Sequence, residues 1–314
     1  MTNTKTYVWC TYREWSFNIL EAIQDLDNWQ VGLLVTTENC IYDFEQFRKR
    51  GIPILKVNPK KAKKEFQKGG RVYEEIIKLK PETIITPGWS WYIPKELLDF
   101  RPCVTYHPGK LPKDRGGSPI QNQMRNGEDW TYINVMKQEE GLDEGPVYLK
   151  RKISLSGYAD DVWRRMTSSG VLLTREYLQG IGSGMLKPKI QPNEEPTIYK
   201  RVKPEDAKLE PSKQTANQMF NIIRAHYETD PNGYVVPAYI NLGQSKKIEI
   251  YKASVKNKLN RQKFIIDLHK DYKEEFHNLL DKTNNDGLTL VLNDKNNNPL
   301  YISQARLTLI KAIK

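Results

Sequence analysis

Short apolar runs and amphipathic stretches take turns at the start of the chain, and this order predicts how the fold begins. Runs rich in β-branched and aromatic residues predict buried strands at Lys5–Thr11, Val31–Thr36 and Pro53–Val57. Between them, Ser16–Leu26 and Phe44–Arg50 place apolar residues at helical spacing. An order of strand, helix, strand, helix, strand is typical of a doubly wound α/β sheet whose strands run mainly parallel.

The same alternation continues as far as a long amphipathic helix. Further helices are predicted at Lys68–Lys80, Pro94–Leu98, Pro119–Arg125 and Asp160–Tyr177, and further strands at Thr83–Thr86, Tyr132–Met136 and Pro146–Ile153. On the last of these helices, Val162, Met166, Val171 and Leu172 form the expected buried side. No GxGxxG phrase follows any of the strands, so a dinucleotide site is not expected.

A change of composition near residue 185 predicts a boundary between two domains. Glycine and proline crowd the span Gly182–Pro196, which is typical of a linker. We therefore assign residues 1–185 to a first domain and residues 186–314 to a smaller α+β domain with an antiparallel sheet. Its expected elements are a helix at Thr215–Ala225, a turn at Asp230–Gly233 and strands at Ile248–Ala253, Gly287–Leu292 and Leu300–Ile302.

Charge and composition indicate more about the partner of the protein than about its fold. The formal net charge of +11 indicates an anionic partner, either nucleic acid or a phosphorylated small substrate. The lysine cluster at Lys60–Lys64 is typical of a solvated helix face. The chain starts without the apolar run of a signal peptide, and no stretch is long enough to span a bilayer. Three widely spaced cysteines form no disulfide framework and no metal pattern, which favours a reducing, cytoplasmic location.

The stretch Cys103–Gln121, CVTYHPGKLPKDRGGSPIQ, holds the densest candidate chemistry. It begins as an apolar strand end and becomes a loop rich in Pro, Gly, Lys and Arg. Open α/β sheets bind ligands at the carboxyl ends of their strands, and His107 lies at such an end. An imidazole there can exchange protons near neutral pH, although a lone loop histidine is as often an ordinary hydrogen-bonded surface side chain. Gly116 and Gly117 would let another molecule approach the backbone.

A second phrase, QEEGLDEGPVYLKRKISL, places Asp143 between two glycines downstream of His107. By itself, an aspartate in this setting commonly shapes a turn. Taken together, however, HPG-LP-RGG-P and GLDEGP resemble the folate-dependent formyltransferases, which include methionyl-tRNA, glycinamide ribonucleotide and sugar N-formyltransferases. Both motifs occur in the order and at the spacing of that family, and the resemblance runs from about Tyr7 to Tyr239. It implies a Rossmann-like formyltransferase domain followed by a smaller carboxyl-terminal domain.

The resemblance implies a catalytic Asn, His and Asp triad, of which two members map to His107 and Asp143. The Asn position, two residues before the histidine, is occupied by Thr105. Formyl transfer to an amine passes through a tetrahedral centre with a developing oxyanion. His107 is suited to donate toward that oxygen, and Asp143 to orient the imidazole and take the amine proton. Either Thr105 or a water replaces the missing Asn donor, or His107 carries more of the load.

The resemblance also implies 10-formyltetrahydrofolate as the cofactor, with two sets of contact residues. In the family, the loop that follows Thr83–Thr86 lines the pterin site, although core packing would equally explain its tryptophans. The expected cofactor-binding residues are Pro87, Gly88, Trp89, Gly117, Pro119, Ile120, Gln138, Glu139 and Gly141. The expected substrate-binding residues are Tyr12, Arg13, Lys113, Arg115 and Arg224. Arg224 suits a phosphate, and capping of helix carbonyls is its alternative role.

The acceptor is predicted from the phrases CTYREWS and PGWSWYIPKELL, which are most similar to the sugar N-formyltransferases. They imply a nucleotide-linked 4-amino-4-deoxysugar, either GDP-perosamine-like or dTDP-linked, used in surface polysaccharides such as the lipopolysaccharide O-antigen. On this interpretation the enzyme is a homodimer, with neither nucleic acid nor a membrane as partner. The first alternative is a methionyl-tRNA formyltransferase. The second, motivated by Thr105, is a non-catalytic ligand-binding homologue.

Overall fold

The structure is a computed structural model, which describes residues 4–227, 236–241, 246–255, 263–265, 289–293, 295–296 and 298–309. Backbone packing divides the chain into two compact units. Unit 1 comprises Met1–Gly116, Trp130–Ser154 and Trp163–Ile198, and unit 2 comprises Gly117–Asp129, Leu155–Val162 and Tyr199–Lys314. Two short segments from the first half of the sequence therefore belong to unit 2. The domain boundary expected after residue 185 stays a prediction.

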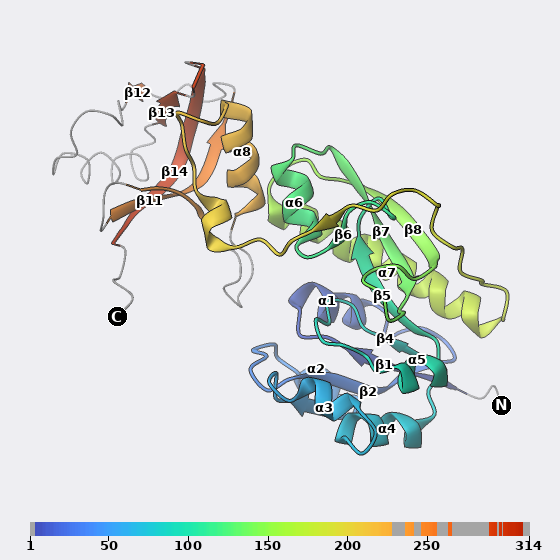
Figure 1. The fold of residues 1–314 in the computed structure, drawn as a ribbon. Coiled ribbons are helices and arrows are strands. Elements are labelled where there is room, and N and C mark those ends of the chain that lie inside the picture. Colours follow the sequence, from blue (N-terminus) through green and yellow to red (C-terminus); the bar gives the residue numbers. More distant parts are fainter. Residues whose placement is uncertain are drawn as a thin grey trace. The chain divides into compact units, whose positions relative to one another are not determined.

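Unit 1 is built on a seven-stranded sheet with the order β3-β2-β1-β4-β5-β7-β8 (Figure 1). Its strands are β1 (Lys5–Cys10), β2 (Trp29–Thr37), β3 (Ile54–Val57), β4 (Thr83–Ile85), β5 (Cys103–Pro108), β7 (Trp130–Lys137) and β8 (Val147–Ser154). The first five strands of this order run parallel, and β7 and β8 add an antiparallel edge. The predicted doubly wound, mainly parallel Rossmann-like sheet is confirmed.

Helices cover both faces of this sheet, as buried parallel strands require. They are α1 (Glu14–Ala22), α2 (Glu45–Lys49), α3 (Ala62–Phe66), α4 (Arg71–Leu79), α5 (Lys95–Phe100) and α7 (Ala159–Gly182). On one face, Phe66, Ile76 and Leu97 from α3, α4 and α5 join Val8 and Cys103 of the sheet in one apolar cluster. This core holds β1, β4 and β5 rigidly, and so fixes the loops that follow them.

The opposite face of the sheet is covered by α1 and α7, and polar contacts set the position of α7. The Tyr177 hydroxyl shares a hydrogen bond of 2.8 Å with Thr83 Oγ1, and the Tyr106 hydroxyl one of 2.6 Å with Thr174 Oγ1. The predicted buried side of this helix is wrong at Leu172, which is 50% exposed. A spacing of 3.6 residues puts Leu173 and Thr174 on the buried stripe in its place.

In its described residues, unit 2 has two α-helices, a 3₁₀ helix and a five-stranded sheet of order β10-β11-β14-β13-β12. The elements are α6 (Pro119–Arg125), η1 (Pro204–Ala207), α8 (Ala216–Ala225), β10 (Ala238–Asn241), β11 (Lys246–Ser254), β12 (Lys263–Ile265), β13 (Thr289–Asn293) and β14 (Pro299–Leu309). Two further short strands are β6 (Arg115–Gly116) and β9 (Ile198–Tyr199). The ladders of β10, β11, β14 and β13 are antiparallel, as predicted for this small sheet.

Helix α8 packs on the sheet of unit 2 and begins with a capping box. Thr215 Oγ1 accepts from Gln218 N at 3.2 Å, and Gln218 Oε1 accepts from Thr215 N at 2.8 Å. Met219 and Ile223 then join the apolar cluster on this sheet. The turn predicted at Asp230–Gly233 lies outside the described residues.

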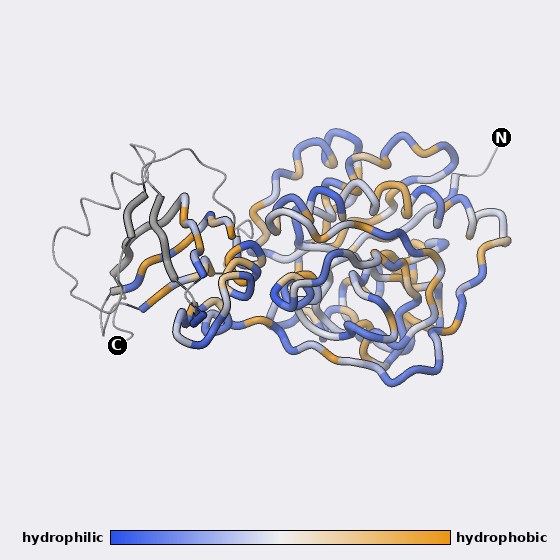
Figure 2. Tube along the Cα trace, turned by 90° about the horizontal axis from the view of Figure 1, so that it is seen from above, coloured by the Kyte–Doolittle hydropathy of each residue, from blue (hydrophilic) through white to orange (hydrophobic). Residues whose placement is uncertain are grey.

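Hydrophobic and hydrophilic residues alternate along the described trace (Figure 2), and the fully buried side chains include Val8 and Trp9 of β1 and Ile84 of β4. None of the described helices is long and apolar enough to cross a membrane. Cys10 and Cys103 are buried in β1 and β5, and all three cysteines are free thiols. Burial raises the pKa of both buried thiols, so neither is a ready nucleophile.

Candidate active site

The predicted site residues of unit 1 lie on loops around the carboxyl ends of neighbouring parallel strands. Residues 11–13 follow β1 and residues 86–91 follow β4, while β5 continues to Pro108 before its own loop begins. The loop of residues 138–146 joins β7 to β8 and starts beside β5, because Gln138 N donates to Cys103 O at 2.7 Å. Strand ends that meet at one edge of a sheet are where α/β proteins place ligands.

His107 is buried near the end of β5, with 5% of its surface exposed. Its Nε2 lies 2.7 Å from the carbonyl oxygen of Asp114. Because a carbonyl only accepts hydrogen bonds, Nε2 carries a proton in this contact. Nδ1 lies 3.4 Å from Oδ2 of Asp143. Both ring nitrogens therefore face oxygen atoms, one of a backbone carbonyl and one of a carboxylate.

Asp143 is held in place by the backbone of the β5 loop. Its Oδ2 accepts a hydrogen bond of 2.9 Å from Gly116 N, and its own backbone has a left-handed φ of +52°. Gly116 also has a positive φ, of +95°, which favours glycine at this contact. The two motifs are thus joined at one point, where the carboxylate of Asp143 meets both His107 and Gly116.

Two buried amides stabilise this arrangement, and the sequence did not single out either of them. Asn134 of β7 donates from Nδ2 to His107 O at 2.9 Å and to Gly109 O at 2.8 Å. Gln191 donates from Nε2 to Asp143 O at 2.8 Å and to Gly145 O at 2.9 Å. A lone Asn within the apolar strand YINVM was a local signal for the first, whereas Gln191 lies in the expected linker without any signal.

The hydroxyl of Thr105, which occupies the Asn position of the triad, is already engaged. Thr105 Oγ1 donates to Thr86 O at 3.0 Å. The neighbouring Thr86 Oγ1 donates to Gln138 Oε1 at 2.9 Å, and Cys103 Sγ lies 3.0 Å from the same oxygen. Thr105 and the Gln138 carboxamide are therefore linked through one residue. The only hydroxyl proton of Thr105 is directed at a carbonyl rather than outward.

An aromatic cluster joins the loops that follow β1 and β4. The ring of Tyr12 lies edge-on to Trp89 and Trp91, with centroids 6.3 and 5.1 Å away, and the two tryptophan centroids are 4.8 Å apart. Arg13 stacks its guanidinium 4.5 Å from the centroid of Tyr12. Trp89 is 7% exposed and belongs to the apolar core, yet its Nε1 is buried without a hydrogen-bond partner in the described chain. The cluster thus combines core packing with one unused donor.

The other residues expected to contact the cofactor in unit 1 flank this region. Pro87 is buried, and Gly88 has a φ of +71° with Arg13 packed against it. Glu139 is exposed and pairs with Lys137 at 3.3 Å, whereas Gly141 lies next to the Glu144 side chain. These residues line the loops near His107, but none of them contacts its side chain in a hydrogen bond or ion pair that the structure defines.

The two cations expected to bind the substrate in unit 1 differ in their surroundings. Arg115 donates to Glu144 Oε1 at 3.3 Å and to Gln191 Oε1 at 2.8 Å. Its side chain is only 11% exposed, so its charge is largely used in holding the Asp143 loop. Lys113 is exposed and has no ion pair within the described residues. Lys113 is therefore the more accessible of the two cations, whereas Arg115 keeps one buried donor, Nε, without a hydrogen-bond partner in the described residues.

The remaining predicted residues belong to unit 2. Gly117 lies against the backbone of Arg201, Pro119 begins α6, and Ile120 is fully buried. Arg224 is 6% exposed and donates to the carbonyls of Leu155 and Met124. Burial lowers the pKa of the Arg224 guanidinium. The arginine thus ties three segments of unit 2 together, and its expected contact with a substrate phosphate stays a prediction.

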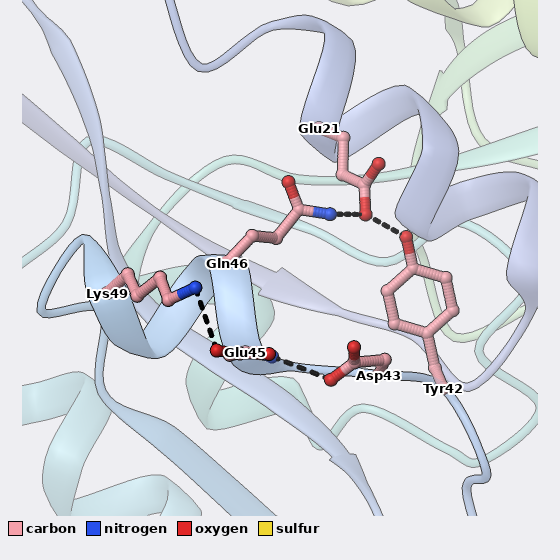
Figure 3. A pocket seen from close by; sticks show the side chains of 6 residues that line it. All are labelled: Glu21, Tyr42, Asp43, Glu45, Gln46 and Lys49. Atoms are coloured by element: carbon pink, nitrogen blue, oxygen red, sulfur yellow. Dashed lines mark hydrogen bonds and ion pairs between the residues drawn. The ribbon is translucent and has the colours of Figure 1, made fainter.

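A surface hollow of about 340 Å³ lies away from all of these residues, beside α1 and α2 (Figure 3). Its polar groups bind one another: the Glu21 carboxylate accepts from Tyr42 and Gln46, and Lys49 pairs with Glu45 at 2.7 Å. Because these groups are mutually satisfied, the hollow offers no group suited to catalysis. In the described part of the chain, no three potential ligands gather in a way that would hold a metal ion.

Comparison with known proteins agrees with this geometry. The formyl transferase family matches residues 15–168 of the chain, a span that includes His107 and Asp143. A methionyl-tRNA formyltransferase from Kosmotoga olearia is 32% identical over 190 residues, which are 59% of this chain and 58% of that protein. The match therefore spans less than two thirds of the relative's length.

Solved structures extend the likeness to the fold of both units. Methionyl-tRNA formyltransferase from Clostridium thermocellum superposes with a TM-score of 0.60 at 25% identity, covering 81% of this chain and 95% of that one. A sugar N-formyltransferase from Shewanella gives the same TM-score of 0.60 at 15% identity, covering 79% and 96%. The second likeness shows the shared fold alone, so the curated relatives favour the tRNA alternative over the predicted aminosugar.

Proposed function

Because this chain belongs to the formyl transferase family, we propose that it transfers the formyl group of 10-formyltetrahydrofolate to a primary amine. The observation that carries the proposal is the buried pair of His107 and Asp143, whose Nδ1 and Oδ2 atoms lie 3.4 Å apart. The pair combines a proton donor, a carboxylate that orients it, and a backbone anchor at Gly116. A proton donor and a carboxylate placed in this way accelerate acyl transfer to an amine.

His107 is the residue that donates toward the formyl oxygen. Nδ1 faces Asp143, so Nε2 is the ring nitrogen that can donate to a substrate. Nε2 already carries a proton, which it donates to the Asp114 carbonyl. With a formyl donor bound, this Nε2 proton would be the one available to the formyl oxygen. A donor aimed at the developing oxyanion stabilises the transition state more than the ground state. Asp143 orients the imidazole and accepts the proton released by the attacking amine, directly or through one water.

The chain's own residues fit a flat, hydrogen-bonding cofactor at the loops after β4 and β7. Trp89 keeps an unused buried donor there, and the Gln138 carboxamide uses only its oxygen in the bonds to Thr86 and Cys103. When bound, 10-formyltetrahydrofolate supplies an activated formyl group on a nitrogen that leaves readily. Pro87, Gly88, Glu139 and Gly141 complete the proposed cofactor set in unit 1.

Methionyl-tRNA is the acceptor that the known relatives support best. The curated relatives with 29–32% identity are methionyl-tRNA formyltransferases, and one of their solved structures covers most of both chains. The net charge of +11 suits a polyanionic acceptor. A nucleotide-linked aminosugar remains the second candidate because CTYREWS and PGWSWYIPKELL resemble the sugar enzymes, and because Tyr12 and Arg13 lie together with Trp89 and Trp91.

A direct acceptor assay tests the proposal. The protein is incubated with 10-formyltetrahydrofolate carrying a labelled formyl group and with methionyl-tRNA, uncharged tRNA, or a panel of aminosugar nucleotides. Label is expected on methionyl-tRNA and absent from uncharged tRNA, because only the charged form carries the α-amine. Transfer of the label only to an aminosugar nucleotide would change the proposed acceptor but support the proposed reaction. A failure to move label to any amine, together with no binding of a folate analogue, would overturn the proposed reaction.

A further inference from the structure

Lysines and aromatic rings gather on one side of the antiparallel edge of the unit 1 sheet. We call Lys110, Trp130, Tyr132, Lys150 and Lys152 the lysine–aromatic strip. Lys152 Nζ lies 4.1 Å and Lys110 Nζ 4.7 Å from the ring centroid of Trp130, and Lys150 Nζ lies 4.6 Å from that of Tyr132. The two rings meet edge to face at 5.3 Å. Each of these three ammonium groups therefore lies over an aromatic ring.

Strand register places this strip on the same face of the sheet as His107. His107 pairs with Asn134 of β7, and Asn134 pairs with Lys150 of β8. Directly opposed residues share a face, and so do residues two apart on one strand, which adds Tyr132 and Trp130. Two strand spacings separate the backbones of His107 and Lys150, a distance of about 10 Å. The side chain of Lys150 can therefore reach toward an acceptor bound at the histidine.

The strip and part of the proposed cofactor set lie at opposite ends of β7. Gln138, Glu139 and Gly141 follow the end of the strand, Asn134 stands beside His107, and Tyr132 and Trp130 lie toward the start. With the cofactor beside the end of β7, an amine that approaches His107 from the other end of this strand would pass the strip.

Two of the three lysines of the strip carry charges that no carboxylate of the described residues neutralises. Lys150 and Lys152 are exposed, and neither has a carboxylate partner within the described residues. Lys113, in the loop between His107 and Gly116, is exposed and unpaired in the same way. Phosphate groups are the counterions that such a set of fixed ammonium groups favours, and interleaved rings with cations are typical of surfaces that bind single-stranded nucleic acid.

We propose that the lysine–aromatic strip binds the single-stranded end of an RNA acceptor and directs its terminal amine to His107. This inference rests on the proposed function and names the surface that recognises the acceptor. A simpler role for lysines on an edge strand is to prevent pairing with another sheet. The two roles differ in what they predict for RNA, because only the first makes affinity depend on Lys150 and Lys152.

The test compares two double substitutions that remove the same charge. Lys150→Gln with Lys152→Gln changes the strip, whereas Lys60→Gln with Lys64→Gln changes exposed lysines next to β3, at the opposite edge of the same sheet. Binding of a fluorescent RNA hairpin with a single-stranded 3′ end is measured by anisotropy at several salt concentrations. This readout needs no catalysis, and thermal unfolding of each variant checks that the fold is kept.

The strip variant is expected to bind the hairpin on the order of tenfold more weakly, while the control binds as the wild type does. Loss of two phosphate contacts also makes the slope of log affinity against log salt shallower by about 1.4. Equal affinity and slope for the strip variant and the wild type would overturn the proposal. If the wild type nevertheless transfers formyl groups to methionyl-tRNA in the acceptor assay, equal affinities reject the role of the strip alone and leave the proposed function standing.

A second arm separates RNA from small nucleotides. If the wild type binds no RNA but transfers formyl to an aminosugar nucleotide, the strip is overturned as an RNA surface and the acceptor is the small molecule. If the strip variant loses RNA affinity and its KM for methionyl-tRNA rises with kcat unchanged, the strip acts in binding the acceptor, as proposed.

Discussion

Two histidines, one in each unit, are almost equally buried and yet lie in opposite chemical settings. His107 in unit 1 is 5% exposed and has an oxygen atom facing each of its ring nitrogens. His226 in unit 2 is 1% exposed, with Nδ1 at 3.2 Å from Val236 O and with no partner for Nε2 in the described chain. Burial, together with the nearby charge of Arg125, lowers the pKa of His226 to about 4.

The contrast teaches that burial alone does not equip an imidazole for proton transfer. At neutral pH His226 stays uncharged, because burial and the charge of Arg125 oppose an added proton more than the Val236 carbonyl and Asp206 favour it. At His107, the carboxylate of Asp143 and the carbonyl of Asp114 surround the ring with acceptors. His226 is therefore an uncharged part of a core, whereas His107 is the residue that we propose exchanges a proton with a substrate.

Replacing each histidine in turn gives the largest expected difference. His107→Ala should lower kcat for formyl transfer by about 10²- to 10⁴-fold, the range expected for loss of a general acid. His226→Gln serves as the matched control, and its rate near pH 7.5 should stay close to that of the wild type. Rates are measured with labelled 10-formyltetrahydrofolate under saturating acceptor. Equal losses in the two variants would show that the comparison is wrong and that His107 acts only through stability.

Removing the charge beside His107 should have the next largest effect. Asp143→Asn keeps an oxygen that can accept from Gly116 N, so the loop is expected to retain its position. The carboxylate that orients the imidazole and takes the amine proton is lost, which should lower kcat by roughly 100-fold or more. Single-turnover rates of the variant and the wild type provide the check, because they report the chemical step separately from acceptor binding. An unchanged rate would remove Asp143 from the mechanism.

Substitutions at Thr105 should show whether the rate of formyl transfer can also be raised. Its hydroxyl is committed to Thr86 O, so we expect Thr105→Val to change the rate little. Thr105→Asn adds the amide donor of the family triad and should raise kcat, on the order of tenfold. Single-turnover rates of the three proteins separate chemistry from binding. A large loss in the valine variant would contradict this reasoning, because it would assign the oxyanion donor to the threonine hydroxyl itself.

Protonation of His226 should change the free energy of unfolding and not the rate of formyl transfer. Its pKa of about 4 in the folded chain lies below the ordinary value near 6.5. Between these values the unfolded chain takes up a proton that the folded chain refuses, so stability falls as the pH drops from about 6.5 to 4 and changes no further from this group below that. The expected loss is roughly 3 kcal/mol. Urea unfolding across this range measures it, and His226→Gln should make the dependence shallower by the same amount.

The sequence predicted the fold well because strand and helix periods depend on neighbouring residues. The alternation between Lys5 and Ile153 located the sheet of unit 1, and two local motifs located His107 and Asp143. What it could not predict are the contacts between distant segments. Asn134 and Gln191 reach the site from another strand and from the expected linker. The lone Asn in YINVM marks a polar residue in an apolar strand, but no local pattern identifies the partners of either amide.

Arg115 and Leu172 illustrate two further limits of the sequence. The motif marks Arg115 as a cation near the site, but only the fold reveals that Glu144 and Gln191 already use its guanidinium. The apolar pattern correctly predicts a helix with one buried side, but it places that side one residue too early: Leu173 is buried, and Leu172 is 50% exposed. Both depend on three-dimensional neighbours that a local pattern does not contain.

A double-mutant cycle on His107 and Asp143 tests whether the two residues act as one catalytic unit. Rates of formyl transfer are measured for the wild type, His107→Ala, Asp143→Asn and the double variant under the same conditions. Since the two residues act as one unit, the double variant is expected to be hardly slower than His107→Ala alone. If the two losses multiply in the double variant, the residues act independently, and the account of a coupled pair across 3.4 Å is contradicted.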